Sequence, residues 1–257
     1  MDLFSVKNKV AIITGSTRGI GRATALCLAA QGAIVYINGR GKVVVEKYVN
    51  ELRNEGFSAD GCVGDVSDEK FVKQFIQYVF EKNGCLDILI NNAGISEIRL
   101  LEEIDFEAWS KFINNNLTSV FLMCREAARL MKQQRNGKII NISSLAAFRG
   151  RIGGAHYAAS KSGIIGFTKT IAKELGPFNI QVNAIAPGIV NTEMPRRNTE
   201  KYQSFFDAVT RGSPLRRITQ PEDIANTVLF LSSSLSDAIT GQVLTVDCGS
   251  SLNYFGI

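Results

Sequence analysis

The sequence predicts an α/β fold in which one parallel sheet is covered by helices on both faces. Short β-branched apolar runs alternate along the chain with longer amphipathic stretches. The apolar runs are nearly continuous, which is typical of parallel strands that are buried on both faces. The pattern fills all 257 residues without a linker, a low-complexity segment or a repeat of solenoid period. We therefore expect a single doubly wound domain over residues 1–257.

Seven apolar runs are predicted to be strands, and six amphipathic stretches are predicted to be helices. The first strand, residues 10–13, reads Val-Ala-Ile-Ile, and β-branched residues of this kind favour strands. The later strands are expected at residues 33–37, 59–63, 86–90, 137–142, 180–185 and 243–246. The helices are expected at residues 19–31, 42–55, 68–83, 105–135, 155–176 and 221–234.

Residues 188–215 are predicted to be an insertion that covers the substrate. The stretch is polar, contains Pro195 and Pro214, and has room for a short helix near residues 200–211. It follows the carboxyl end of a predicted strand, where ligands bind in sheets of this type. Long connections at such places often act as lids, and a disordered surface loop is the alternative.

Composition and charge exclude several classes of protein. The 45% hydrophobic and 21% charged content is ordinary for a soluble globular chain. No apolar run has transmembrane length and the N-terminus lacks a signal-peptide pattern, so we expect a cytoplasmic protein without membrane contact. The net charge of +5 is dispersed, which argues against nucleic-acid binding. Five scattered cysteines and a single histidine, His156, lack metal-ligand spacing, so we expect reduced thiols and no metal.

The first predicted strand leads into a glycine-rich turn that suits an anion. The turn has the spacing Gly-x-x-x-Gly-x-Gly, and an amphipathic helix follows it. Glycines permit a tight turn and a close approach of backbone N–H groups, and the helix N-terminus adds partial positive charge. A plain strand-to-helix loop is the alternative. The residues expected to contact a dinucleotide here are Gly15, Ser16, Thr17, Arg18, Gly19, Ile20 and Gly21.

The end of the second predicted strand favours NADP(H) over NAD(H). A dinucleotide fold that selects NAD usually places Asp or Glu there to bind the ribose 2′-hydroxyl. This chain reads Asn38-Gly39-Arg40 instead. Arg40, together with Arg18, supplies two guanidinium groups that suit a 2′-phosphate. A solvated Arg40 is the alternative.

Two further strand ends carry candidate cofactor contacts. Asp65, which precedes Val66, could accept a hydrogen bond from an adenine amino group or could cap the next helix. The run Asn-Asn-Ala-Gly at residues 91–94 suits a backbone segment that lies against a cofactor, and a simple turn is the alternative. The residues expected to contact the cofactor here are Asp65, Val66, Asn92, Ala93 and Gly94.

Tyr157 and Lys161 are four residues apart and would share one face of a helix. A cation beside the phenol would draw its pKa from about 10 toward neutrality, so that the tyrosine could exchange a proton. Ser144, thirteen residues upstream of Tyr157, could hydrogen-bond the oxygen whose proton moves. The same spacing also occurs where a lysine merely packs its stem on a ring.

Taken in order, these motifs resemble those of the short-chain dehydrogenase/reductase family, and the resemblance covers essentially the whole chain. Within the family the chain is similar to 3-oxoacyl-carrier-protein reductase-like members. The resemblance implies a Rossmann-type fold, hydride transfer between NADP(H) and a carbonyl or secondary alcohol, and a homotetramer. The motifs are Thr14-Gly15-x-x-x-Gly19-Ile20-Gly21, Asn91-Asn92-Ala93-Gly94, Ser144, Tyr157-x-x-x-Lys161, Pro187-Gly188 and the closing run Thr240–Gly249.

The resemblance also implies roles for single residues. Tyr157 would be the acid/base, and Lys161 would hold the nicotinamide ribose and lower the pKa of the tyrosine. Ser144 would bind the substrate oxygen, and Asn116 would position a water in a proton relay through Lys161. The residues that would line the nicotinamide and its phosphate are Pro187, Gly188, Ile189 and Thr192.

Some residues leave the partner and the substrate open. Arg135 matches the first of two basic positions that meet an acyl-carrier protein in the family, but Phe178 stands at the second, which makes that partner doubtful. Arg149 and Arg151 could attract an acidic group or lie solvated at the surface. A non-catalytic NADP(H)-binding regulatory or scaffold protein on the same fold is the alternative function. The four residues Asn116, Ser144, Tyr157 and Lys161 together argue against it.

Overall fold

A computed structural model describes residues 4–192 and 199–252 of the chain. Within these residues, seven parallel strands form one sheet in the order β3-β2-β1-β4-β5-β6-β7. The predicted doubly wound α/β fold is therefore confirmed. The strands are β1 (Val10–Ile13), β2 (Ile34–Gly39), β3 (Ala59–Val63), β4 (Ile88–Asn91), β5 (Gly137–Ile142), β6 (Ile180–Pro187) and β7 (Val243–Val246).

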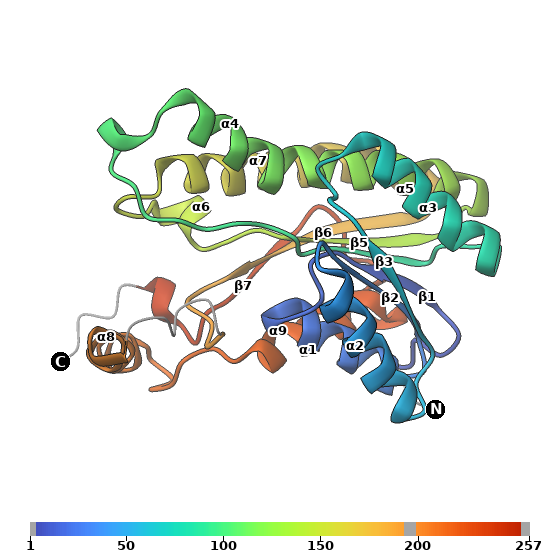
Figure 1. Cartoon of the computed structure of the whole chain (residues 1–257), viewed down its shortest axis with the longest axis horizontal. Coiled ribbons are helices and arrows are strands. Elements are labelled where there is room, and N and C mark those ends of the chain that lie inside the picture. Colours follow the sequence, from blue (N-terminus) through green and yellow to red (C-terminus); the bar gives the residue numbers. More distant parts are fainter. Residues whose placement is uncertain (1–3, 193–198, 253–257) are drawn as a thin grey trace.

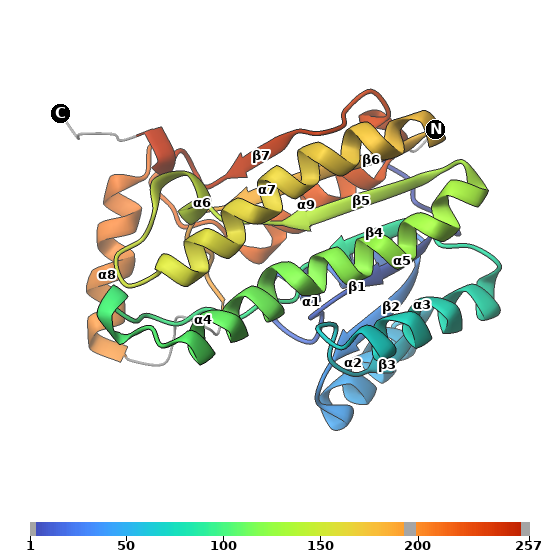
Figure 2. The same cartoon turned by 90° about the horizontal axis from the view of Figure 1, so that it is seen from above.

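One layer of helices packs on each face of the sheet (Figures 1 and 2). Each layer buries its own apolar cluster, with Leu28 and Leu229 on one face and Phe75 and Met123 on the other. Removing this apolar surface from water is the main stabilising contribution to such a fold. The first layer consists of α1 (Gly19–Ala30), α2 (Lys42–Asn54) and α9 (Pro221–Ser232), and the second of α3 (Glu69–Asn83), α5 (Ser119–Gln134) and α7 (Ala155–Leu175).

The single helix predicted over residues 105–135 is interrupted. The structure has α4 (Phe106–Ile113), a π-helical turn η2 (Asn114–Thr118) and then α5. Asn116 lies fully buried in that turn, and its side chain exchanges two hydrogen bonds with the backbone of Ile95. A π turn inserts one residue into a helix and is frequent at functional sites, while apolar periodicity carries no signal for it. The sequence prediction missed the interruption for this reason.

The order of the strands reverses between β1 and β4. Ile13 of β1 pairs with Ile37 of β2 on one side and with Ile90 of β4 on the other. The connections from these strands leave toward opposite faces, so a crevice opens beyond their carboxyl ends, where ligands bind in doubly wound sheets. Any site is expected there.

The insertion predicted at residues 188–215 contains the helix α8 (Thr199–Gly212), slightly longer than expected. Residues 193–198 of this insertion lie outside the described residues. Val190, before them, forms an isolated parallel bridge with Thr219. Figure 1 shows α8 at one end of the molecule, close to the final short helix η5 (Ser250–Leu252).

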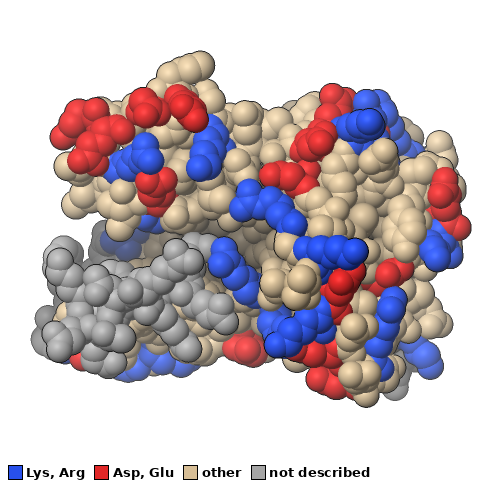
Figure 3. Space-filling view, viewed as in Figure 1, with Lys and Arg blue, Asp and Glu red and all other residues tan. Residues whose placement is uncertain are grey.

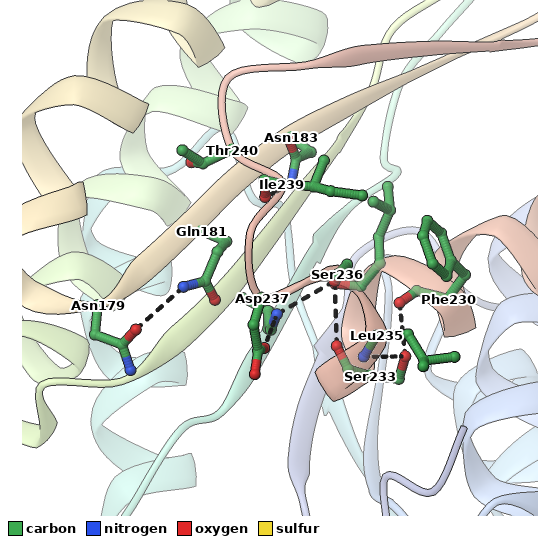
Figure 4. A network of polar contacts seen from close by, with 12 residues as sticks. Asn179, Gln181, Asn183, Phe230, Ser233, Leu235, Ser236, Asp237, Ile239 and Thr240 are labelled. Atoms are coloured by element: carbon green, nitrogen blue, oxygen red, sulfur yellow. Dashed lines mark hydrogen bonds and ion pairs between the residues drawn. The ribbon is translucent and has the colours of Figure 1, made fainter. Parts of the chain in front are cut away.

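At the amino ends of β5 and β6, a polar network fixes the segment that leads to β7 (Figure 4). The ammonium of Lys138 donates to Ser236 Oγ at 3.2 Å and lies 2.7 Å from a carboxylate oxygen of Asp237. Asn183 of β6 donates from Nδ2 to the carbonyl of Ile239 at 2.8 Å. Figure 4 shows Ser236, Asp237 and Ile239 along the segment after α9, with Asn183 next to Ile239. They lie at the opposite end of the strands from the expected site.

Candidate active site

A cavity of about 1880 Å³ opens at the carboxyl ends of the strands. Figure 3 shows the hollow from outside, with Lys and Arg side chains gathered along its edge. The structure brings most of the predicted site residues together around it. Three of them do not line it, namely Ser16, Gly21 and Asn116. Those that do are Gly15, Thr17, Arg18, Gly19, Ile20, Arg40, Asp65, Val66, Asn92, Ala93, Gly94, Ser144, Tyr157, Lys161, Pro187, Gly188, Ile189 and Thr192.

The glycine-rich turn packs tightly against the neighbouring strand end. Gly15 has a φ of 61°, and a Cβ there would lie 2.9 Å from Ala93 Cα. Gly19 has a φ of 53° and opens α1, and a Cβ on it would lie 3.2 Å from Thr192 Cγ2. The side chain of the N-cap residue Arg18 makes no capping hydrogen bond. The first N–H groups of α1 therefore face the cavity with their partial positive charge.

Ser16 and Gly21 lie behind this turn and support it. Ser16 Oγ accepts a hydrogen bond from the Asn38 N–H at 2.9 Å and donates to the Ile13 carbonyl at 2.7 Å. A Cβ on Gly21 would lie 2.5 Å from Asn92 Nδ2, which itself donates to the carbonyl of Gly15 at 3.0 Å. These two residues hold the shape of the turn instead of lining the cavity.

Two side chains to which the sequence analysis gave no role complete the support. Asn38 is buried and accepts the Gly15 N–H at its Oδ1, at 3.3 Å. Thr14 Oγ1 accepts the backbone N–H groups of Asn92 and Ala93, each at 3.0 Å. A polar residue at the end of an otherwise apolar strand was the available signal for both.

Opposite charges meet where the adenine end of a dinucleotide is expected. Arg40 Nη1 lies 3.6 Å from Asp65 Oδ2. Burial works to raise the pKa of Asp65, but hydrogen bonds from Ser67 and the nearby Arg40 outweigh it and hold the pKa below its usual value. The cap of α3 is Asp68, which accepts from Lys70 N, so Asp65 does not cap that helix.

Tyr157 lies in the first turn of α7 with Ser144, from the segment after β5, beside it. Burial raises the pKa of Tyr157 above its usual value, although the hydrogen bond with Ser144 and the charge of Arg151 act to lower it. From the sequence we expected Lys161 to bring this pKa toward neutrality. In the structure the ammonium of Lys161 lies 5.9 Å from the centre of the tyrosine ring, and burial prevails.

Lys161 points into the same corner and is nearly fully buried. Its Nζ donates to the carbonyl of Ile142 at 2.8 Å, and burial lowers its pKa to about 8. Gly94 faces this group, because a Cβ there would lie 3.5 Å from Lys161 Nζ and 2.9 Å from Asn116 Oδ1. Asn116 therefore lies behind the cavity wall, close to Lys161, where it also donates to Ser160 Oγ at 3.2 Å.

The other side of the cavity is formed by residues 96–98 and by the segment before α7. Arg151 lies over the ring of Tyr157, with its guanidinium carbon 5.4 Å from the ring centre. Its Nη1 donates to Ser96 Oγ at 2.9 Å. Arg149 donates to the carbonyl of Ser250 at 2.7 Å and also lines the cavity. The sequence analysis named both arginines as possible contacts for an acidic group, but it did not predict that residues 96–98 line the cavity.

Comparison with known proteins identifies the family. A family model described as "Enoyl-(Acyl carrier protein) reductase" matches residues 15–251. The chain belongs to the short-chain dehydrogenase/reductase family. It is accordingly an oxidoreductase, as the motifs predicted.

Relatives of this short-chain dehydrogenase/reductase cover almost its whole length. The 3-oxoacyl-[acyl-carrier-protein] reductase FabG of Aquifex aeolicus is 40% identical over 248 residues, which are 95% of this chain and 98% of the relative. FabG of Thermotoga maritima is 41% identical over 244 residues, with the same coverage of 95% and 98%. A solved structure of a putative gluconate dehydrogenase from Agrobacterium tumefaciens matches with a TM-score of 0.93 and 36% identity, over 98% of this chain and 99% of that one.

The cavity of this short-chain dehydrogenase/reductase has the features that a dinucleotide needs. Gly15, Gly19 and Gly94 leave space that a side chain would fill. The uncapped start of α1 offers N–H groups for a pyrophosphate, and Arg18 and Arg40 lie exposed at the same end. In the described part of the chain, every helix is too short or too polar to cross a membrane.

Proposed function

We propose that this protein catalyses the reversible, NADP(H)-dependent reduction of a carbonyl to a secondary alcohol, with Tyr157 as the acid/base. The observation that carries the proposal is the meeting of the Tyr157 phenol with Ser144 and Lys161 in one corner of the cavity. The glycine-rich turn and Arg40 lie at the other end of the same cavity. A single bound dinucleotide would therefore reach from the phosphate-binding turn to the tyrosine.

NADP(H) is proposed because of the charges at the end of β2. Arg40 and Arg18 would bind the 2′-phosphate, and no carboxylate follows β2 directly to bind a free 2′-hydroxyl. When bound, the nicotinamide would supply the hydride for reduction or accept it in the reverse direction. The backbone of residues 92–94 and of residues 187–189, with Thr192, would position it against Tyr157.

The residues in this corner of the cavity would have different roles at the reacting oxygen of the substrate. Ser144 and Tyr157 would both donate hydrogen bonds to it, which stabilises the negative charge that develops during reduction. Tyr157 would then deliver its proton to this oxygen. Lys161 would bind the ribose hydroxyls, and its charge would favour the tyrosinate after the proton leaves. Asn116, which is fixed by Ile95 and Ser160, would hold a water that connects Lys161 to solvent.

The substrate class is proposed from the relatives and from the site together. The names of the FabG relatives support a 3-oxoacyl-type substrate, and the name of the gluconate dehydrogenase neighbour supports a sugar acid. Arg135 is exposed, but Phe178 packs under Lys132, so an acyl-carrier protein would meet only one of the family's two basic positions. The carrier protein remains the less favoured partner.

Three further observations bear on the oligomeric state, the compartment and the covering of the substrate. Phe106, Trp109 and Phe121 are exposed on α4 and α5, which supports the homotetramer expected from the family. All five cysteines lie within the described residues and are free, which supports a reducing compartment such as the cytoplasm. Within the insertion, α8 would cover the substrate, because Val209 and Gly212 of this helix line the cavity.

Replacing Tyr157 by Phe tests the proposed chemistry. The Tyr157→Phe variant should bind NADPH nearly as well as the wild type, while its turnover of diketones, quinones and β-keto esters should fall about 10²-fold or more. Tyr78→Phe, remote from the cavity, is the matched control. Undiminished turnover in Tyr157→Phe would overturn the assignment. Wild-type protein that binds NADPH tightly and reduces none of these carbonyls would favour the scaffold alternative.

A further inference from the structure

We propose that the substrate carries an anionic group a few bonds from its reacting carbonyl, and that the guanidinium of Arg151 binds this group. This inference rests on the proposed function, because it assigns a substrate class to the same site. Arg151 would be a specificity-determining residue, while the acid/base chemistry remains with Tyr157. The ligand chemistry is that of a carboxylate or a phosphate ester.

The position of Arg151 is the first observation. Its guanidinium carbon lies 5.4 Å from the centre of the Tyr157 ring, within the range of a cation–π contact. An oxygen that accepts the tyrosine proton would lie within a few ångströms of the phenol edge of that ring. A group a short distance along the substrate would therefore come within reach of the guanidinium.

The hydrogen bonds of Arg151 fix it without using all of its donors. Nη1 donates to Ser96 Oγ at 2.9 Å and Nη2 donates to the Glu97 carbonyl at 3.1 Å. A guanidinium has five N–H donors, so with respect to the described residues Nε and one hydrogen on each terminal nitrogen remain for a ligand. Both partners are neutral oxygens, which leaves the positive charge of Arg151 uncompensated by them.

The loop that carries Arg151 is held in place by the opposite wall. The Arg99 N–H donates to the Gly153 carbonyl at 2.9 Å. Gly153 has a φ of 64°, and a Cβ on it would lie 2.6 Å from Ile98 Cγ2. The loop at Gly153 therefore packs closely against residues 98–99, and its positive φ favours glycine. A cation placed on such a fixed loop loses little conformational entropy when an anion binds to it.

The charges of the surrounding wall favour an anion. Glu97 is the nearby carboxylate, and it lies 2.6 Å from Arg99 in an ion pair that neutralises it. Arg149 adds a second cation to the same wall, bound to the carbonyl of Ser250. Among the described residues, neither Arg149 nor Arg151 has a carboxylate within ion-pair distance. Arg151 beside the reacting corner, with Arg149 elsewhere on the cavity wall, would bind an anionic substrate more tightly than its neutral analogue.

Pairs of carbonyl compounds that differ in charge test the proposal. The pairs are acetoacetate with ethyl acetoacetate, and dihydroxyacetone phosphate with dihydroxyacetone. For each pair, kcat/KM with NADPH and the binding constant by calorimetry on the NADP-loaded enzyme are measured in the wild type, in Arg151→Ala and in Arg151→Lys. Lys82→Ala removes one exposed positive charge far from the cavity and is the matched control.

We expect the wild type to prefer the anionic member of at least one pair, and Arg151→Ala to reduce that preference about tenfold or more, mainly through KM. Arg151→Lys should keep part of the preference, and Lys82→Ala all of it. The ratio within a pair cancels any effect of Arg151 on the pKa of Tyr157, which acts on both members alike. The carboxylate and phosphate pairs distinguish the two sources of the anion.

The outcomes separate this inference from the proposed function. A wild type that does not prefer the anionic member of either pair, or an unchanged preference in Arg151→Ala, would overturn the role of Arg151 while leaving the oxidoreductase assignment intact. Absence of turnover with every compound would count against the proposed function. The calorimetric preference for an anion, and its loss in Arg151→Ala, would still decide the inference in that case.

Discussion

Arg40 and Asp65 form an ion pair at the mouth of the cavity, with Nη1 and Oδ2 3.6 Å apart. The two residues come from different strand ends, β2 and β3, which pair in parallel. The carboxylate holds the guanidinium at the edge of the cavity, where both groups remain substantially exposed. An incoming phosphate would gain the planar, bidentate donor set of a positioned arginine.

Removing the Arg40 side chain should therefore weaken the binding of NADPH more than the binding of NADH. In Arg40→Ala the KM for NADPH should rise about tenfold, because a charge-assisted phosphate contact is lost, and the KM for NADH should change less than about twofold. Steady-state kinetics with both cofactors measures this. Arg53→Ala is the matched control, since Arg53 is an exposed arginine paired with Asp60 away from the cavity. Equal changes for the two cofactors would contradict a role in 2′-phosphate selection.

The sequence predicted the strands and most of the helices because their signal is local. Runs such as Val10–Ile13 are buried along their whole length, and burial on both faces is what produces a continuous apolar run. The glycine turn was also readable, since the positive φ of Gly15 and Gly19 requires that residue type. The observed bounds of these elements differ from the expected ones by a few residues at most.

Features that depend on distant contacts were not readable in the same way. The π turn at Asn116 is stabilised by the backbone of Ile95, twenty-one residues away, and leaves no periodic signal. The pKa of Tyr157 depends on how deeply the fold buries the phenol, while helical spacing reports only the neighbour Lys161. The position of Arg151 over that ring follows from its hydrogen bonds to residues 96 and 97.

Breaking the ion pair between Lys138 and Asp237 should destabilise the fold. The lysine is nearly buried and the distance is 2.7 Å. Among the described side chains, the hydroxyl of Ser236 is the one hydrogen-bond partner that would remain for its ammonium. We expect Asp237→Ala to lower the free energy of unfolding by about 1–3 kcal/mol in urea denaturation. Glu46→Ala, which breaks the exposed pair with Lys42, should change it by less than about 0.5 kcal/mol. Equal losses of unfolding free energy in the two variants would show that the burial of Lys138 does not strengthen its ion pair.

His156 should make the protein less stable in mild acid. Its ring is fully buried 3.8 Å from that of Phe112, and neither nitrogen has a hydrogen-bond partner in the described part of the chain. Burial lowers its pKa; among the charges facing it, Glu97 acts to raise the pKa, and Arg99 and Arg151 act to lower it. Because the unfolded chain then binds the proton more readily, stability is lost as the pH falls below about 6.5.

Replacing His156 by Gln isolates this effect. Between pH 7.5 and 5.5 the wild type should lose stability relative to His156→Gln by up to about 1.4 kcal/mol for each pH unit below 6.5. Urea denaturation at several pH values measures the difference. Parallel pH dependence in the two proteins would mean that His156 does not titrate on unfolding.

Burial of the Lys161 ammonium should lower the free energy of unfolding, although the proposed mechanism requires this group. Its pKa is lowered from 10.5 to about 8 because the folded chain buries the ammonium. Below pH 8 the group is charged in both the folded and the unfolded chain, and the full cost of burying it is present. Between about 8 and 10.5 only the unfolded chain keeps the proton, so stability rises with pH across this window. The difference between the two pKa values corresponds to about 3 kcal/mol.

A lysine-to-methionine change at this position removes the buried charge at similar length. At pH 7, Lys161→Met should be more stable than the wild type by up to about 3 kcal/mol, and the gap should close as the pH approaches 10. Its turnover should nevertheless be lost, since no ammonium remains beside Tyr157. Lys173→Met, at an exposed position of the same helix, should show neither effect. A gap that stays constant from pH 7 to 10 would contradict the lowered pKa, because an uncharged or solvated lysine has no such pH dependence.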